Sequence, residues 1–322
     1  MKILITGAAG FIGSNLCEYM LEKGYTVIGL DNFATGYAYN LDEIVGKSNF
    51  SFIEGNICDI ATCLKATQNV DYVLHQAALG SVPRSLQDPI TSNEVNVNGF
   101  LNMLEASKQN GVKRFVYAAS SSTYGDSEGL PKVEDEIGKP LSPYAITKYV
   151  NELYAEIYGT AFGLDTIGLR YFNVFGRKQD PDGAYAAVIP KFIAQFLKGV
   201  SPVINGDGSY SRDFTYIDNV IQMNHLAMTT KNSDAVNQVY NTAVGDRITI
   251  KEMAEAIKTG LMKYKKEVAK IPLQFGPERL GDVPHSQASI EKAKNLLNYN
   301  PTHNFKEGIE ASLEWYYNNL KT

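Results

Sequence analysis

Short apolar runs alternate with amphipathic stretches through the first half of the chain. Helical periodicity spans Ile12–Lys23, Asn93–Asn110 and Pro143–Phe162. Six runs between and around these stretches have the pattern of β-strands. Several of the runs are apolar nearly throughout, as expected for a parallel sheet that is covered on both faces. These runs are Lys2–Thr6, Thr26–Asp31, Phe50–Glu54, Tyr72–His75, Arg114–Ala118 and Thr166–Arg170. The alternation predicts a doubly wound α/β fold with a parallel sheet and right-handed crossovers.

Beyond about residue 175 the pattern becomes irregular. Helical stretches remain, separated by turn-rich segments such as Asn205–Ser209, and they cover Tyr185–Lys198, Asp218–Met228, Ile250–Leu261 and Phe305–Leu320. We therefore expect residues 1–175 to form the sheet domain, with a return of the chain near residues 215–242. We expect residues 176–322 to form mainly a smaller α/β lobe.

Composition adds mostly exclusions. A net charge of -5 over 322 residues gives no basic surface for nucleic acid. No apolar run approaches the roughly 20 residues that span a bilayer. Three glycines break the apolar N-terminus, which therefore does not resemble a secretory signal. Three cysteines without metal-ligand spacing indicate reduced thiols of a cytoplasmic protein and no metal site.

A glycine-rich turn follows the first predicted strand directly. Gly7, Gly10 and Gly13 stand between that strand and the first helix. A dinucleotide's pyrophosphate needs close backbone approach, and a helix N-terminus supplies N–H groups and a positive dipole end. The second strand ends at Asp31, where a carboxylate can bind ribose hydroxyls and repel a 2′-phosphate. No Arg or Lys follows over Asn32–Tyr39. The sequence therefore predicts NAD and not NADP.

The motif Tyr-x-x-x-Lys occurs three times, as Tyr19/Lys23, Tyr144/Lys148 and Tyr317/Lys321. Only Tyr144 follows a strand that ends in a serine cluster, Ser120–Ser122, and only Tyr144 follows a Ser-Pro helix start. A phenol is a poor base at neutral pH unless nearby positive charge favours its ionised form. We expect the helix start, Lys148 and the positively charged nicotinamide to favour that form, so that Tyr144 can accept a proton from an alcohol.

These features resemble the extended short-chain dehydrogenase/reductases, whose glycine motif has the same GxxGxxG spacing. The resemblance implies a Rossmann-type domain and a catalytic Ser120–Tyr144–Lys148 triad, with Ser122 as the alternative serine. It also implies a set of NAD-contacting residues: Gly7, Gly10, Phe11, Ile12, Gly13, Asp31, Asn32, Asp59, Ile60, Gln76, Ala77, Ala78, Asn96, Tyr144, Lys148 and Tyr171.

Two serines, Ser121 and Ser122, stand where the related 4,6-dehydratases carry acidic residues. Without a carboxylate for elimination, the resemblance favours removal of hydride from C4 of a sugar and its return to the other face. That is the reaction of a nucleotide-sugar 4-epimerase with tightly bound NAD. Residues 176–322 would then be mainly the lobe that binds a UDP-sugar.

The similarity extends to the substrate side. The arginines Arg212 and Arg279 match the family's diphosphate ligands, as guanidinium forks suit a buried dianion. Ser286 stands where epimerases restricted to unacetylated sugars carry a bulky Tyr, and the Gly80–Ser85 segment resembles that of UDP-N-acetylhexosamine 4-epimerases. The implied substrate residues are Ser81, Arg84, Ser121, Ser122, Asn173, Val203, Asn205, Arg212, Arg279, Asp282 and Ser286.

Three other functions stay open. A UDP-glucose/UDP-galactose 4-epimerase differs only in the sugar, and a UDP-uronate 4-epimerase should need a cation near C6. A non-catalytic NAD-binding regulator would generally lack the Tyr144/Lys148 pair. The family also suggests a homodimer through the helices Asn93–Asn110 and Pro143–Phe162.

Overall fold

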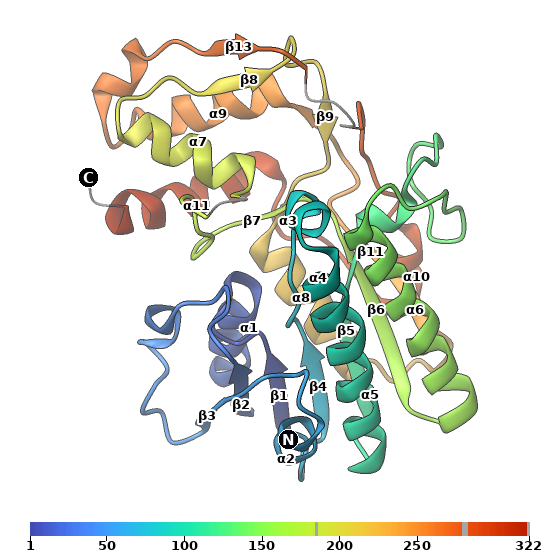
Figure 1. The fold of residues 1–322 in the computed structure, drawn as a ribbon. Coiled ribbons are helices and arrows are strands. Elements are labelled where there is room, and N and C mark those ends of the chain that lie inside the picture. Colours follow the sequence, from blue (N-terminus) through green and yellow to red (C-terminus); the bar gives the residue numbers. More distant parts are fainter. Residues whose placement is uncertain (184–185, 279–282, 321–322) are drawn as a thin grey trace.

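Seven parallel strands form one sheet in the order β11-β6-β5-β4-β1-β2-β3 (Figure 1). The computed structural model describes residues 1–183, 186–278 and 283–320. In chain order the strands are β1 (Lys2–Thr6), β2 (Thr26–Asp31), β3 (Phe50–Glu54), β4 (Tyr72–His75), β5 (Arg114–Ser120), β6 (Asp165–Tyr171) and β11 (Gln238–Thr242). This is the Rossmann-type α/β fold that the sequence predicts.

The six predicted strands are all confirmed, and β5 and β6 extend further than expected. Their pairing continues through Ala119 with Arg170 and Ser120 with Tyr171, so β5 ends on the first residue of the serine cluster. The seventh strand, β11, was not among the predicted strands. Its sequence QVYNT carries buried polar residues, Asn241 and Thr242, which obscure the apolar pattern of an edge strand.

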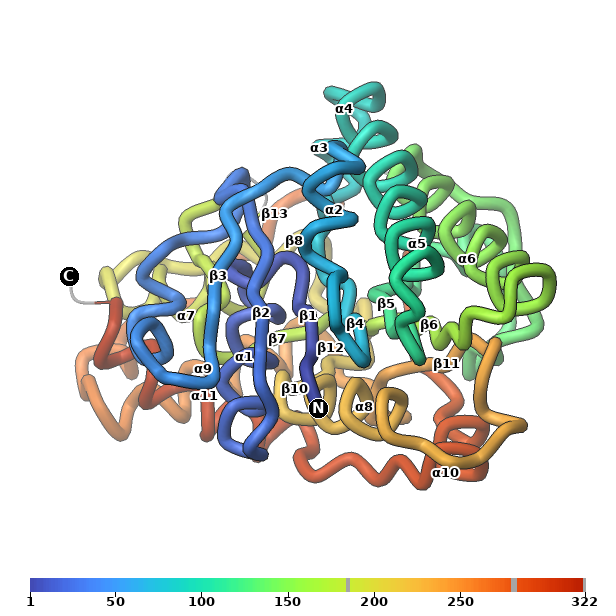
Figure 2. Tube along the Cα trace, turned by 90° about the horizontal axis from the view of Figure 1, so that it is seen from below, coloured from blue at the N-terminus to red at the C-terminus, as the bar shows by residue number. Residues whose placement is uncertain are grey.

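Helices cover both faces of the sheet (Figure 2). One face is packed by α1 (Phe11–Glu22) and α8 (Ile217–Thr229), and the other by α2 (Ile60–Ala66), α5 (Phe100–Gln109) and α6 (Pro143–Phe162). Two apolar clusters result. The cluster on the α2/α5/α6 face stays within the sheet domain, whereas the other runs from α1 into the C-terminal lobe and joins the two parts into one core.

The predicted helix Asn93–Asn110 is divided. A short helix, α4 (Pro89–Asn93), follows α3 (Val82–Gln87), a π-helical turn covers Glu94–Gly99, and α5 begins at Phe100. At Gly99 a Cβ would lie 2.6 Å from the Ile57 side chain, so this turn packs closely on its neighbour. A π-turn leaves no signature in apolar periodicity, which is why the pattern suggested one helix.

The C-terminal lobe lies above the carboxyl ends of the strands in Figure 1. Its helices α7 (Val188–Leu197), α9 (Ile250–Leu261) and α11 (Phe305–Asn319) pack together, and α10 (Glu291–Leu297) packs beside β11. Capping boxes start α9 and α11. Helix α7 begins at Val188, later than the predicted Tyr185, which lies outside the described residues.

Short strand pairs complete the lobe, and they carry several predicted substrate residues. The pairs are β8 (Val203–Asn205) with β13 (Gln274–Gly276), β9 (Ser211–Arg212) with β12 (Ile248–Thr249), and β10 (Thr215–Tyr216) with β7 (Val174–Phe175). Within residues 215–242, helix α8 packs on the sheet and β11 forms one of its strands. The assignment of cofactor and substrate to the two parts stays a prediction. Among the described helices, none has the length and apolarity that crossing a bilayer would demand.

Candidate active site

The strand order reverses direction at β1, which lies between β4 and β2. In doubly wound sheets such a switch point opens a ligand crevice at the carboxyl ends of the strands. The glycine-rich turn after β1 and the Gln76–Ala78 turn after β4 meet there. A Cβ on Gly7, whose φ is +67°, would lie 2.9 Å from the Ala77 nitrogen, and one on Gly13 would lie 2.0 Å from the Gly7 oxygen. Only glycine fits these two positions.

The start of α1 is open to an anion. No side chain caps this helix and its first turn holds no acidic residue, so its leading N–H groups can donate to a phosphate. Nearby, the Asp31 carboxylate accepts the amides of Ala9 at 2.9 Å and Phe33 at 2.8 Å. These bonds aim the carboxylate at the turn and leave lone pairs for ribose hydroxyls. The residues present therefore fit NAD.

The three predicted catalytic residues come from two adjoining elements. Ser120 ends β5, while Tyr144 and Lys148 lie in the first turns of α6. The predicted helix start is confirmed, because the Ser142 hydroxyl accepts the Ala145 amide at 3.2 Å. The Lys148 side chain, only 3 % exposed, donates to the Ala118 carbonyl at 2.8 Å and so lies across the end of β5.

Both candidate serines belong to one hydrogen-bonded group. The Ser122 hydroxyl donates to the Ser120 Oγ at 2.9 Å, and the Ser122 amide approaches the same atom at 3.2 Å. Ser120 in turn interacts with the Tyr144 hydroxyl, which lowers the pKa of that phenol. This arrangement places Ser120 between Ser122 and Tyr144 and favours Ser120 as the serine nearest the phenol.

Burial dominates the electrostatics of Tyr144 and Lys148. Burial raises the pKa of Tyr144 by more than the Ser120 hydrogen bond lowers it, so the chain's own groups do not favour a phenolate. Burial also lowers the pKa of Lys148 to about 8, although the charge of Glu152 opposes that shift. We expect the positive charge of oxidised nicotinamide, together with Lys148, to oppose the effect of burial and to favour proton loss from Tyr144.

Substrate-side candidates lie on the facing lobe. Arg212 in β9 donates to the carbonyls of Ser211 at 2.9 Å and Pro284 at 3.0 Å. The Ser286 amide donates to the Ser211 carbonyl at 3.0 Å, so Ser286 sits on the segment next to Arg212. Arg279 and Asp282 lie outside the described residues.

The other substrate candidates differ in whether their side chains are exposed or already hydrogen-bonded within the protein. Val203 and Asn205 are the two outward-facing residues of β8. Asn173 adopts a positive φ of 35°, and its side chain donates to the Asp213 carbonyl at 2.9 Å. Its amide nitrogen is thus engaged by the protein.

Several predicted cofactor residues also have partners within the chain. Asn96 is buried and bonds both backbone groups of Leu79 and the Thr147 hydroxyl. Asp59 caps α2, accepting the amides of Ala61 and Thr62. The remaining candidates on this side are half-buried or exposed: Phe11, Ile12, Asn32, Ile60, Gln76, Ala77, Ala78, Ser81, Arg84 and Ser121.

The other two Tyr-x-x-x-Lys motifs lie elsewhere. Lys23 lies over the Tyr19 ring at 5.1 Å on the surface of α1. Tyr317 is near the end of α11, and Lys321 lies outside the described residues. Neither tyrosine adjoins the serine cluster.

Comparison with known proteins matches this geometry. Residues 3–243 match the NAD-dependent epimerase/dehydratase family. The chain belongs to this family. The UDP-glucose 4-epimerase of Mycolicibacterium smegmatis is 35% identical over 99% of both chains. Two solved structures are also similar. The UDP-N-acetylglucosamine 4-epimerase of Methanobrevibacter ruminantium M1, in complex with UDP-N-acetylmuramic acid, has 36% identity, 98% coverage of both chains and a TM-score of 0.91. The UDP-glucuronic acid 4-epimerase of Bacillus cereus, in complex with UDP-glucuronic acid and NAD, has 32% identity, 100% coverage of both chains and a TM-score of 0.86.

The protein is thus an NAD-dependent enzyme of the epimerase/dehydratase family. Within the described part of the chain, no group of three or more His, Cys, Asp or Glu side chains is placed to hold a metal ion.

A buried ionic network behind the triad was missed by sequence reasoning. Arg170 in β6 forms two bonds to Glu152, at 2.9 and 2.7 Å, and a third to the Glu134 carbonyl at 2.8 Å. Its guanidinium lies 4.8 Å from the centre of the Tyr124 ring. Removing one partner of such a pair costs about 3–5 kcal/mol. Arg170 and Glu152 stand 18 residues apart in the chain and come from different elements, so no spacing rule pairs them.

A closed ring of hydrogen bonds supports the predicted cofactor residues Gln76 and Tyr171. The Tyr171 hydroxyl donates to Gln76 at 2.9 Å, Gln76 donates to Asn224 at 3.1 Å, and Asn224 donates back to Tyr171 at 2.9 Å. Asn224 comes from α8 and carries no motif, so sequence reasoning missed it. Because each polar atom has a defined partner, the ring fixes how Gln76 and Tyr171 present themselves at the crevice.

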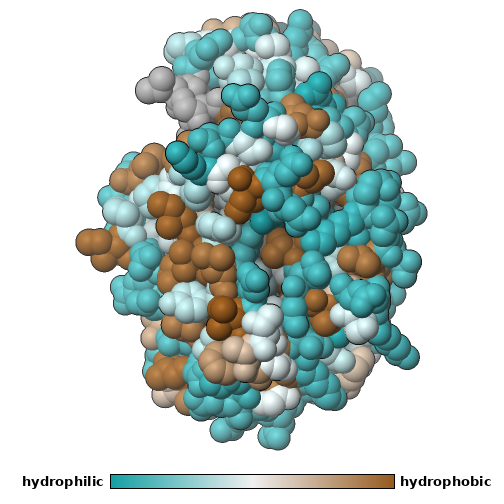
Figure 3. All heavy atoms as spheres, turned by 90° about the vertical axis from the view of Figure 1, so that its right-hand side faces the viewer, coloured by the Kyte–Doolittle hydropathy of each residue, from teal (hydrophilic) through white to brown (hydrophobic). Residues whose placement is uncertain are grey.

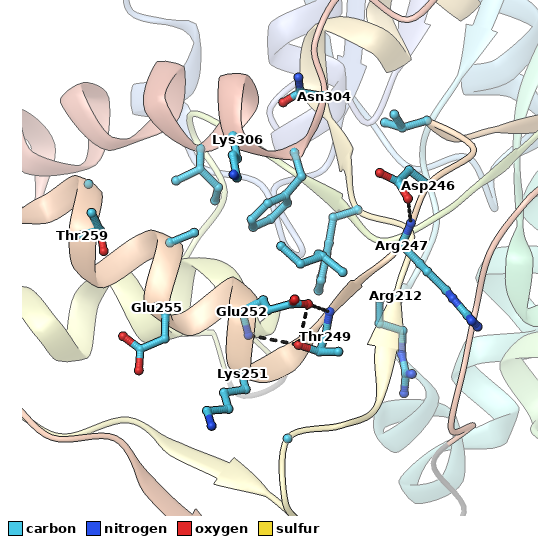
Figure 4. Close-up of a pocket in the computed structure, with 18 of the residues that line it drawn as sticks. Arg212, Asp246, Arg247, Thr249, Lys251, Glu252, Glu255, Thr259, Asn304 and Lys306 are labelled. Atoms are coloured by element: carbon cyan, nitrogen blue, oxygen red, sulfur yellow. Dashed lines mark hydrogen bonds between the residues drawn. The ribbon is translucent and has the colours of Figure 1, made fainter.

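Two cavities lie in and beside the lobe. One of about 1150 Å³ is bounded by α9, α11 and β12, and Arg212 is the one predicted residue in its described lining. Figure 4 shows Arg212 and Arg247 together at one edge, far from Thr259 and Lys306. We assign no substrate group to it, because no triad residue borders it. The other, of about 860 Å³, lies between Ser81 and Pro83 and helix α7. Ser81 and Pro83 belong to the α3 segment, which contacts the start of α6. In that contact the Ser85 hydroxyl accepts a hydrogen bond from the Tyr144 amide at 3.0 Å.

Proposed function

We propose that this enzyme interconverts UDP-N-acetylglucosamine and UDP-N-acetylgalactosamine by 4-epimerisation. The observation that carries the reaction type is the grouping of Ser120, Tyr144 and Lys148 at the carboxyl end of β5, in the same sheet as β1 and its glycine-rich turn. UDP-sugar 4-epimerases among its relatives support the substrate class.

The chain's part in the reaction is proton transfer and orientation. When bound, NAD accepts hydride from C4 of the sugar and returns it. Tyr144 takes the proton from O4 as that hydride leaves and gives it back when the hydride returns, so no atom is lost. Ser120 orients O4 by hydrogen bonding. Lys148, one helical turn after Tyr144 on α6, supplies positive charge on the same side of the helix. Residues 120–123 hold no carboxylate that could drive elimination of water.

Retention of the 4-keto sugar requires that the nucleotide stay anchored while the sugar turns. Arg212, Asn173 and the outward residues of β8 are the described candidates for that anchor. An anchor on the nucleotide would leave the sugar free to present either face for reaction at C4.

The acetylated substrate rests on one side chain. Ser286 is half-buried on the segment beside Arg212, and a hydroxymethyl there leaves volume that a 2-acetamido group could fill. Relatives that act on UDP-glucose and UDP-glucuronic acid make those sugars the competing substrates.

We further propose that the enzyme is a homodimer. Exposed apolar side chains form one stripe on α6, at Ile146, Leu153, Tyr154 and Ile157. Val82 and Leu86 of α3 and Ile90 of α4 add to it, and Ile90 is 80 % exposed. Figure 3 shows such hydrophobic side chains gathered on this side of the molecule. A contiguous patch of this kind favours burial against a second copy.

A panel of UDP-sugars tests the substrate proposal. Purified enzyme is given UDP-GlcNAc, UDP-Glc and UDP-glucuronic acid in separate reactions, and the C4 epimers are separated. We expect the highest kcat/KM with UDP-GlcNAc. A higher kcat/KM with either unacetylated sugar would contradict the proposal.

A further inference from the structure

Asp213, between β9 and β10, is a fully buried carboxylate that no sequence motif singled out. Its Oδ1 accepts the Val244 amide at 3.0 Å, and its Oδ2 accepts the amides of Gly245 at 3.0 Å and Ala288 at 3.3 Å. Among the described residues, no Lys or Arg forms an ion pair with it. The carboxylate is therefore satisfied by backbone amides from two other segments.

The two segments are also bonded to each other. The Gln287 side chain donates a hydrogen bond to the Gly245 carbonyl at 3.0 Å. The residue Asp213, the loop after β11 and the 284–289 segment are therefore joined in pairs. Gly245 has a φ of +86°, a left-handed conformation that aims its amide at the carboxylate. We call Asp213, Val244, Gly245, Gln287 and Ala288 the Asp213 clamp.

Two substrate candidates are chain neighbours of clamp residues, and a third is hydrogen-bonded to one of them. Arg212 precedes Asp213, and its guanidinium is braced on the Pro284 carbonyl. Ser286 precedes Gln287 and pairs through its amide with Ser211. Asn173 donates its side-chain amide to the Asp213 backbone carbonyl at 2.9 Å. The clamp therefore fixes the spacing between Arg212, Asn173 and Ser286.

Burying a carboxylate without a cation is costly unless its oxygens are hydrogen-bonded. Burial raises the pKa of Asp213 to about 7, while the three amides act in the opposite direction. An apolar residue would avoid that cost but could not hold three amides from two separate segments at one point.

We propose that Asp213 is a positioning residue for nucleotide-sugar binding, which holds Arg212 and Ser286 in register through the clamp. This inference rests on the proposed function and deepens it. It concerns binding of the nucleotide part and leaves the proton transfer at Tyr144 and the NAD site untouched.

The test uses Asp213→Asn, which keeps the volume but replaces one acceptor oxygen by a donor that faces amide N–H groups. Asp246→Asn is the matched control, since this exposed neighbour loses the same charge and bonds only the amide of Arg247. Affinity for UDP is measured by calorimetry, NAD content after denaturation, and KM and kcat with the UDP-sugar that the wild type prefers. We expect Asp213→Asn to bind UDP about 10- to 100-fold more weakly, with raised KM, kcat within a few-fold and unchanged NAD content. Asp246→Asn should behave as wild type.

UDP affinity within twofold of wild type in folded Asp213→Asn would overturn the inference, and so would a parallel loss of bound NAD. If that variant does not fold, Gln287→Ala decides, because it breaks one side of the clamp without touching a charge. We expect about a 3- to 10-fold loss of UDP affinity in Gln287→Ala, and no loss would overturn the inference. A wild type that binds no UDP or UDP-sugar would instead refute the proposed function.

Discussion

The Gly7–Gly13 turn and the Asp213 clamp are built in contrasting ways. The turn is local, because Gly7 and Gly13 contact each other and the adjoining strand end through backbone atoms. The clamp is assembled from three segments spread between residues 213 and 288, joined by side-chain bonds. If the proposed roles hold, cofactor binding depends on the absence of side chains at the turn, and substrate positioning depends on a few side chains that reach distant backbone.

Because the two regions are built differently, mutations in them should have different effects. A change on the cofactor side should alter NAD retention, and a change on the lobe should alter which sugar is accepted and how tightly. A change in the predicted triad should alter turnover alone. The following predictions test that separation, beginning with the largest effect.

Tyr144→Phe should lower kcat about 10²–10⁴-fold, the range for a general acid–base group. The ring and its packing remain, so NAD content and UDP affinity should stay as in the wild type. Steady-state epimerisation and bound-cofactor analysis measure both. Tyr19→Phe is the control and should be nearly silent, while wild-type turnover in Tyr144→Phe would refute its role as the base.

Ser286→Tyr should change sugar preference without a general loss of activity. The larger side chain would overlap a 2-acetamido group, and such overpacking typically costs 1–3 kcal/mol. We therefore expect the ratio of kcat/KM for UDP-GlcNAc over UDP-Glc to fall about 10- to 100-fold. Equal effects on both sugars would show that Ser286 does not line the 2-position.

Asp31→Ala should affect only the cofactor side. It removes an acceptor for ribose hydroxyls and the repulsion of a 2′-phosphate, so NAD retention should weaken about 10-fold. Discrimination against NADP should relax together with it. Competition binding of the two dinucleotides is the measurement, and an unchanged preference would contradict the role given to Asp31.

The lowered pKa of Lys148 predicts an upper pH limit for activity. Burial lowers its pKa from an ordinary value of 10.5 to about 8, so the ammonium is fully present below pH 7 and is lost as pH rises through 8. If that charge is required, kcat/KM should fall above pH 8 and approach about a tenfold loss per pH unit. Lys148→Arg should shift the decline upward, because Arg stays protonated. A flat profile to pH 10 would contradict the requirement.

Ile157→Glu should have the smallest effect on chemistry. A charge in the middle of the α6 stripe should split the dimer, seen as a halved mass in sedimentation, while the triad stays intact. Met262→Glu, an exposed apolar residue of the lobe, is the control. A wild-type monomer, or an unchanged mass in Ile157→Glu, would exclude this interface.

The same contrast explains what the sequence could reveal. Strands β1 to β4 begin and end where their apolar runs predict, and Tyr144 was distinguished from two other tyrosines by its Ser-Pro helix start. These signals are local. The Asn224 ring, the Arg170–Glu152 pair and Asp213 depend on contacts between residues far apart in the chain, which no spacing rule contains.

The pKa of Tyr144 shows what the sequence does not contain. The helix start and Lys148 can be recognised in the sequence, whereas the burial that raises this pKa is a property of the folded chain. Local patterns therefore predict candidate catalytic residues but not their electrostatic state.

The central claim is that hydride leaves C4 of a UDP-sugar and returns to the same carbon within one enzyme. It is tested by giving purified protein, without added NAD, UDP-GlcNAc carrying deuterium at C4, and analysing the product by NMR. The account predicts UDP-GalNAc that retains deuterium at C4 and gains none from deuterated solvent in a parallel reaction. Loss of the label to solvent, or failure to form a C4 epimer from any UDP-sugar, would contradict it.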